Sequence, residues 1–218
     1  MRSSRRALLI TCGVLLLGTA VWSVTASIRP PAPLDADPWD AGVGAVAGRD
    51  VFASCASCHL ADASGRPDGS IPRLAGQRAA ILQRKLERLA SGEVDLPVMA
   101  GFAASLQPAE ITAVSTWLAG LPDPAPRDPP AGAGALLYAG SCLPCHGPQA
   151  EGQDALGAPR LCGQHAPYLL RRMQDSAQGA RADADLAMAA IVRAVPQGDR
   201  EVIAAWLAAG SCAPMDQR

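Results

Sequence analysis

Two short segments of the sequence place two cysteines and a histidine at the same spacing. The segment "CASCH" covers residues 55–59, and "CLPCH" covers residues 142–146. Three chemistries use a Cys-x-x-Cys pair: a redox dithiol, half of a zinc site and, where His follows directly, covalent attachment of haem. The elements around the two segments decide among these chemistries.

The two segments belong to a longer internal repeat. The loop "IPRLAGQ" at 71–77 returns as "APRLCGQ" at 158–164, with the same offset of 87 residues that separates the Cys-x-x-Cys-His motifs. In the same way "ILQRKLER" matches "YLLRRMQD", and "STWLAGL" matches "AAWLAAG". Because a Pro-rich run separates the copies, we predict a duplicated unit with domains at 43–121 and 132–212 and a linker at 122–131.

The strongest periodic patterns within each copy are helical. Apolar residues at helical spacing predict helices over 76–91 and 163–178. The segment "QPAEITAVSTWLAG" has Pro108 in its first turn and Gly120 as a stop, and "GDREVIAAWLAAG" is its counterpart. A short helix is expected before each Cys-x-x-Cys-His motif. Since no segment alternates convincingly like a strand, the predicted fold class is all-α, with two tandem domains.

Haem attachment fits this organisation better than the other two chemistries. A zinc site would need both cysteine pairs around one ion, but the pairs belong to separate copies. A redox dithiol would be expected beside a βαβ pattern, which is absent. We therefore predict two covalently bound haem c groups, each held by two thioethers and one proximal His. The predicted attachment residues are Cys55, Cys58, Cys142 and Cys145, and the proximal ligands are His59 and His146.

Methionine sulfur is the expected second ligand of each iron. Met99 is the only Met between His59 and the linker. In the second copy Met188 precedes the Trp-bearing helix at the same distance as Met99 does in the first. The other candidates there are Met173 and Met215. Met173 lies on an apolar helix face, where packing is the expected role. The predicted pairs are therefore His59–Met99 and His146–Met188.

Four residues of the repeated loops are candidates for the haem environment. Pro72 and Pro159 each follow their histidine by 13 residues. A backbone carbonyl there could accept the second imidazole N–H and fix the ring, although a turn proline is the alternative. Arg73 and Arg160 come next, and each either neutralises a haem propionate or lies on the surface.

Three residues of the second copy have no equivalent of the same type in the first. Cys162 and Cys212 form either a disulfide, which an exported protein tolerates, or two free thiols. His165 aligns with Arg78 and is expected at the surface rather than as a competing iron ligand.

The N-terminus has the pattern of an export signal. Arg2, Arg5 and Arg6 precede 22 uncharged residues, Ala7–Ile28. This segment fits a signal peptide cleaved after Ala26, and its length also fits a retained helix anchored in the inner membrane. Both interpretations place the rest of the chain in the periplasm. The predicted terminal segments are a signal or anchor at 1–28, a Pro-rich tether at 29–42 and a tail at 213–218.

Composition limits the class of partner. Without the first 26 residues the chain has 16 basic and 20 acidic residues, which argues against nucleic-acid binding. The chain has only four Trp, two Tyr and two Phe, few for two polypeptide cores. A large apolar cofactor in each domain would complete such cores.

The chain resembles the class I dihaem cytochromes c, most closely those of the c4 type. The resemblance is carried by the two Cys-x-x-Cys-His motifs, the "PRL.GQ" loops and "YLLRRMQDSAQGARAD" followed by Met188, over residues 43–121 and 132–210. It implies two cytochrome c folds packed face to face and a periplasmic carrier near a respiratory oxidase. One departure is Leu60 after His59, where Gly147 occupies the usual position.

The favoured function is single-electron transfer between a respiratory donor and a terminal oxidase or reductase. An iron with both axial positions filled leaves no open site for a substrate, so we predict no enzymatic activity. An alternative is a membrane-anchored cytochrome subunit of a dehydrogenase or oxidase complex. A dihaem enzyme, such as a peroxidase or a thiosulfate-oxidising cytochrome, would need an open, His or Cys position on one haem.

Overall fold

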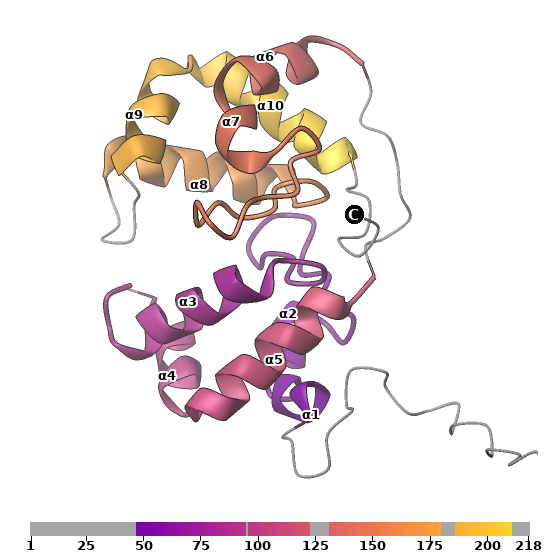
Figure 1. Cartoon of the computed structure of the whole chain (residues 1–218), viewed down its shortest axis with the longest axis vertical. Coiled ribbons are helices and arrows are strands. Elements are labelled where there is room, and N and C mark those ends of the chain that lie inside the picture. The colour runs from indigo at the N-terminus through magenta and orange to yellow at the C-terminus, as the bar shows by residue number, and fades with distance from the viewer. Residues whose placement is uncertain (1–46, 95, 123–130, 180–185, 211–218) are drawn as a thin grey trace, which may run out of the picture. The chain divides into compact units, whose positions relative to one another are not determined.

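Five helices in the first half of the chain recur in the same order in the second half (Figure 1). The structure is a computed structural model that describes residues 47–94, 96–122, 131–179 and 186–210. The first half contains α1 (Gly48–Phe52), α2 (Ala56–His59), α3 (Ala79–Ala90), α4 (Pro97–Ala104) and α5 (Pro108–Gly120). The second half contains α6 (Ala133–Ser141), α7 (Leu143–His146), α8 (Ala166–Gln178), α9 (Leu186–Ala194) and α10 (Gln197–Ala209). These residues form no strand, which confirms the all-α prediction with two tandem copies.

The long helices begin later than their periodicity predicted. Helices α3 and α8 were expected from residues 76 and 163 but start three residues further on. Gly76 and Gly163 have φ values of 69° and 70°, in the left-handed region, so neither can belong to a right-handed helix. Helix α5 starts at Pro108 as predicted, where the Glu110 carboxylate accepts the Gln107 N–H at 2.7 Å.

Two short helices, α4 and α9, were not predicted from the sequence. Their segments are apolar on nearly every face, so they give no helical period. Pro97 occupies the first position of α4, where its fixed φ favours a helix start. Met99 and Met188 are each the third residue of their helix. The structure therefore gives the two methionines equivalent places in the repeat.

The first and last helices of each half cross in direct contact, α1 on α5 and α6 on α10. Two glycines make these crossings possible. A Cβ on Gly48 would lie 2.5 Å from the Trp117 Cβ, and one on Gly134 would meet the Trp206 Cβ even more closely. Next to each crossing, Trp117 and Trp206 pack on the aromatic residue that precedes the Cys-x-x-Cys-His motif, at 5.0 Å between ring centroids in both halves. The crossings thus set the starting point of each motif.

Each half has its own apolar core. In the second half one cluster of buried residues includes Met173, which is 9% exposed, so its predicted packing role is confirmed. In the first half the buried residues form two clusters, and Leu86 packs against both. Leu86 is the counterpart of Met173, whose longer side chain belongs to a single continuous core.

Hydrogen bonds between the repeated "PRL.GQ" loops join the two halves, which belong to one compact unit. The Arg73 N–H donates to Gln164 Oε1 at 3.0 Å, and Gln164 Nε2 donates back to the Arg73 carbonyl at 3.0 Å. Gln77 and Arg160 repeat this pair in the opposite sense, at 3.0 and 2.9 Å. The interface is therefore approximately two-fold symmetric, with each glutamine paired to the backbone of the other loop.

Candidate functional site

Each Cys-x-x-Cys-His motif forms a one-turn helix that ends in a buried histidine. His59 and His146 are both 5% exposed. The Nδ1 atom of His59 lies 3.1 Å from the Pro72 carbonyl, and that of His146 lies 2.8 Å from the Pro159 carbonyl. A carbonyl oxygen only accepts, so Nδ1 carries the proton and Nε2 is the ring nitrogen left with a lone pair. Both imidazoles are thus held in the tautomer that can bind iron through Nε2.

Burial also favours the neutral form of both imidazoles. It lowers the pKa of His59 and of His146, and the hydrogen bond to the proline carbonyl opposes this effect only in part. A histidine binds a metal as the neutral ring. The two histidines therefore fit an iron-ligating role in their charge state as well as in their orientation.

The four motif cysteines are free thiols in the polypeptide. Burial raises the pKa of Cys142 to about 11, and the neighbouring Cys145 adds to this. A reactive dithiol instead needs a lowered thiol pKa. Within the part of the chain that is described, no three His, Cys, Asp or Glu side chains meet as a metal site. These features favour thioether attachment over the dithiol and zinc alternatives.

Two alanines in left-handed conformations hold the proline loops under the histidines. Ala63 and Ala150 have φ values of 55° and 56°, and both are almost completely buried. The Ala63 carbonyl accepts the Leu74 N–H at 2.9 Å, and the Ala150 carbonyl accepts the Leu161 N–H at 2.8 Å. Since these bonds fix the residues just after each proline, they place each proline carbonyl at its histidine.

Met99 and Met188 lie next to the cores that also contact the motif cysteines. Met188 packs against the cluster that Cys142 contacts. Met99 packs against the smaller cluster of the first half, and Leu86 links it to the cluster that Cys55 contacts. Both methionines are half-buried. Their role as iron ligands stays a prediction.

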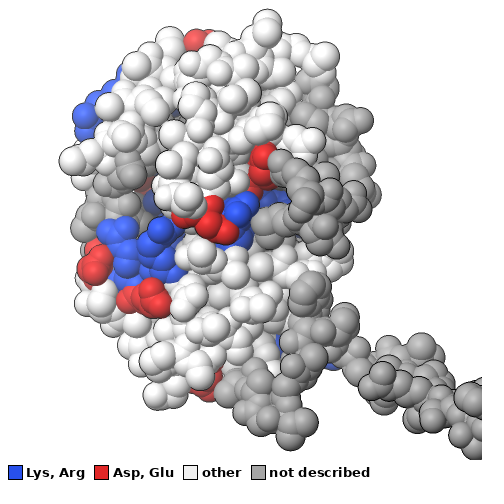
Figure 2. Space-filling view, in the orientation of Figure 1, with Lys and Arg blue, Asp and Glu red and all other residues white. Residues whose placement is uncertain are grey.

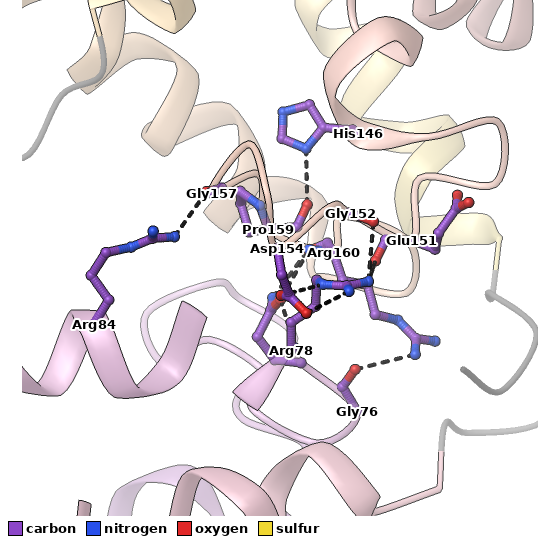
Figure 3. Close-up of polar contacts among 11 residues, drawn as sticks. Gly76, Arg78, Arg84, His146, Glu151, Gly152, Asp154, Gly157, Pro159 and Arg160 are labelled. Carbon is purple, nitrogen blue, oxygen red and sulfur yellow. Dashed lines mark hydrogen bonds and ion pairs between the residues drawn. The ribbon is translucent and has the colours of Figure 1, made fainter. Parts of the chain in front are cut away.

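The arginines predicted beside the haem propionates contact the opposite half. Arg73 Nε donates to the Gly163 carbonyl at 2.9 Å, and Arg160 Nη1 donates to the Gly76 carbonyl at 3.2 Å (Figure 3). Arg160 is buried and Arg73 is half-buried, so neither is the exposed arginine of the alternative interpretation. Their placement beside propionates stays a prediction, with the joining of the halves as a function that the structure adds.

A second pair of equivalent residues that join the halves, Arg78 and His165, was missed as a site. Arg78 forms a two-bond ion pair with Asp154 at 2.6 and 2.7 Å, and its Nη1 donates to the Gly152 carbonyl at 3.1 Å (Figure 3). His165 Nε2 donates to the Ser64 carbonyl at 2.8 Å. His165 is thus half-buried in a contact between the halves, and its expected surface position is wrong. Alignment of the two residues was visible in the sequence, but their partners in the other copy were not.

The residue after each histidine shows where the two copies differ. Leu60 has φ 65° and ψ 159°, and Gly147 has φ 82° and ψ 163°. Only glycine adopts this region readily, and another residue there costs about 1–3 kcal/mol. The first copy therefore contains local backbone strain that the second copy avoids.

We expect Leu60→Gly to stabilise the holoprotein. Relief of the strain exceeds the greater flexibility that glycine gives the unfolded chain, for a net gain of about 1 kcal/mol. The measurement is urea denaturation followed by circular dichroism. As the matched control, Gly147→Ala should lower the free energy of unfolding, because a Cβ there meets the Glu151 carboxylate at 2.5 Å. Destabilisation by Leu60→Gly would contradict the assignment of strain.

The remaining sequence predictions concern residues at the edges of the description. Cys162 is disulfide-bonded, whereas Cys212, its predicted partner, lies outside the described residues, so the pairing stays a prediction. The signal or anchor at 1–28, the tether at 29–42 and the tail at 213–218 also lie outside them. Among the helices that are described, none has the length and apolar character needed to cross a membrane.

Comparison with known proteins gives relatives over most of the chain. It is 32% identical over 190 residues to a "Thiosulfate dehydrogenase electron acceptor" of Thiomonas intermedia, covering 81% of this chain and 87% of that protein. It is 29% identical over 150 residues to a cytochrome c4 of Pseudomonas aeruginosa, covering 63% and 73%. The crystal structure of reduced cytochrome c4 from Pseudomonas stutzeri matches the fold with a TM-score of 0.67 at 24% identity, covering 75% and 97%. No protein-family model matches the chain.

Two tandem helical domains, each with a Cys-x-x-Cys motif and a proximal histidine fixed by a proline carbonyl, define a dihaem class I cytochrome c. It is an electron-transfer protein with two haem c groups rather than an enzyme. Within that class, the chain belongs to the cytochrome c4-type family.

Proposed function

We propose that this chain accepts electrons one at a time from a partner redox protein and passes them on through its two haems. The observation that carries the proposal is the repeated bond from histidine Nδ1 to a proline carbonyl, at 3.1 Å in the first half and 2.8 Å in the second. It leaves both imidazoles oriented and neutral for iron. When bound, each haem supplies a one-electron iron couple.

The chain's own residues attach and tune these groups. Cys55 and Cys58 form the thioethers of the first haem, and Cys142 and Cys145 form those of the second. His59 and Met99 ligate the first iron, and His146 and Met188 ligate the second. The thioether sulfur favours the ferrous state, and a filled sixth position excludes substrate from the iron. Arg73 and Arg160 lie close enough to the interface to neutralise propionates there.

The interface between the halves supports transfer inside the molecule. Its reciprocal bonds run from side chains to backbone amides of buried loops, and such bonds fix position with little freedom. The loops that make these bonds are the same loops that support the proximal histidines. The two haem sites are therefore held by one continuous hydrogen-bonded structure.

The partner is proposed from the relatives and from charge. Since one relative is named an electron acceptor of thiosulfate dehydrogenase, we infer a dehydrogenase of a reduced sulfur compound as the donor and a terminal oxidase or reductase as the acceptor. Figure 2 shows basic side chains interleaved with acidic ones on the face in view, a pattern that suits a protein partner better than nucleic acid. The periplasm is the proposed location, and the comparisons do not favour the anchored-subunit alternative.

The test combines haem stoichiometry with electron transfer. Mass spectrometry of the holoprotein should show two haem additions, on peptides containing residues 55–59 and 142–146. A Cys142→Ser, Cys145→Ser variant should keep one. Purified holoprotein should then be reduced by a thiosulfate dehydrogenase in the presence of thiosulfate, at a rate that saturates with its concentration. A chain with one haem, or one that the dehydrogenase does not reduce, would contradict the attachment sites or the donor respectively.

A further inference from the structure

The repeat is broken at three neighbouring positions around the second histidine. Tyr138 stands where the first half has Phe52, and Gly147 stands where it has Leu60. The third difference is Glu151, whose counterpart in the first half is Ser64. The three residues of the second half contact one another, so the differences form one cluster rather than scattered substitutions.

The cluster buries a carboxylate beside the residue that follows His146. Glu151 is 6% exposed. A Cβ on Gly147 would lie 2.5 Å from the Glu151 carboxylate, which shows how closely the carboxylate approaches the motif backbone. The Gln149 N–H donates to Glu151 Oε2 at 2.9 Å, and Tyr138 Oη donates to the Gly147 carbonyl at 2.6 Å. A hydrogen bond from a backbone N–H favours the ionised carboxylate.

The same carboxylate is close to a haem-attachment residue. Burial raises the pKa of the Tyr138 hydroxyl, and Cys142 and Glu151 raise it further. One buried hydroxyl therefore feels both Cys142 and Glu151. This places the negative charge of Glu151 on the attachment side of the second haem.

We propose that Glu151 lowers the reduction potential of the second haem relative to the first. The proposal rests on the attachment of that haem through Cys142 and Cys145, given above. Ferric iron has one more positive charge than ferrous iron, so a fixed negative charge nearby stabilises the ferric form. Charge and burial around the iron are among the means by which a protein sets its potential.

The other charges near the two motifs do not cancel this difference. Arg78 approaches the Glu151 loop, but its guanidinium is paired with Asp154, and Figure 3 shows the Glu151 carboxylate turned away from it. In the first half the carboxylate on the equivalent loop is Asp62, which is exposed to solvent. A charge in water acts about fourfold more weakly than one in a partly buried site. Arg73 and Arg160 are equivalent by the repeat and contribute to both haems alike.

A lower potential at the second haem gives the molecule a direction. In a half-reduced protein the electron resides mainly on the first haem. Electrons accepted at the second half therefore move toward the first half, which becomes the favoured exit. The Glu151 carboxylate sets this order without touching either iron.

The test is a redox titration of the Glu151→Gln holoprotein. Gln keeps the shape and the acceptor for Gln149 but removes the charge. The potential of the second haem should rise, with a change in its oxidised-to-reduced ratio of about threefold to tenfold, where tenfold is 59 mV for one electron. Nuclear magnetic resonance of the half-reduced protein assigns the haems through contacts to residues 55–59 or 142–146. The first haem should shift much less.

Two further variants keep the test decisive. Asp62→Asn removes the exposed carboxylate of the first half and should leave both potentials nearly unchanged. Leu60→Gly with Ser64→Glu transfers the cluster to the first half and should lower the potential of the first haem. Equal shifts of both haems in Glu151→Gln, or no shift, would overturn the proposal. Mass spectrometry showing two haems in the same sample would separate that outcome from a failure of the attachment sites.

Discussion

A Met99→Ala holoprotein is expected to lose the iron–sulfur signature of one haem and to keep that of the other. Met99 is the third residue of α4 and is half-buried against the core cluster that includes Val94. Without its thioether the first iron becomes high-spin or takes water, and its potential falls by more than the 59 mV that equals a tenfold change in the one-electron ratio. The measurements are the absorption spectrum, with its sulfur-to-iron charge-transfer band, and a redox titration.

Met173→Ala is the matched control for this prediction. Met173 is a core residue of α8, so its truncation should cost about 2–5 kcal/mol of stability and leave both iron–sulfur signatures intact. Met188→Ala should reproduce the spectral loss on the second haem. If Met99→Ala retained both signatures, or if Met173→Ala removed one, the ligand assignment would have to be abandoned.

The parts of the site that the sequence predicted are local in the chain. Each histidine and its proline are 13 residues apart, and the left-handed alanine between them closes a short loop. A spacing of this kind can be read from one strand of sequence because few other conformations satisfy it. The helices α3, α5, α8 and α10 were predicted for a similar reason, since capping and periodicity act within one turn.

The parts that were missed depend on contacts between the copies. The glutamines Gln77 and Gln164 were recognised as repeated, but a repeated residue pairs with its own copy or with the other one, and the sequence does not distinguish these cases. His165 was placed at the surface because its counterpart Arg78 is charged. The structure gives both residues carbonyl partners across the interface. Two-fold pairing is therefore a property of the assembled halves rather than of either loop alone.

The asymmetry around the second histidine shows how a duplicated site can be specialised. Leu60 and Gly147 were noticed as a departure from the repeat, without a reason for it. The reason is spatial, because only a residue without a Cβ leaves room for the Glu151 carboxylate. The small residue and the buried charge therefore have to change together, and the first copy has neither.

Substituting Gly134 by Ala should cost far more than any change elsewhere on α6. The helix crosses α10 at this residue, and the added Cβ would overlap the Trp206 Cβ with further contacts to its ring. Backbone and tryptophan would have to separate, which costs about 3 kcal/mol. Since α6 leads directly into Cys142 and α7, the displacement should also lower the yield of the second haem attachment. Urea denaturation and haem stoichiometry measure the two effects.

Gly140 on the same helix provides a control of opposite sign. It is exposed, nothing lies within 4 Å of a Cβ built on it, and its φ is not positive. Gly140→Ala should therefore stabilise the protein by about 0.5–1 kcal/mol through helix propensity alone. Opposite signs at two glycines six residues apart would show that the crossing, and not helix propensity, determines the cost at Gly134. A stabilising Gly134→Ala would mean that α6 and α10 are not in contact there, and the support that the crossing gives to the second haem site would be lost with it.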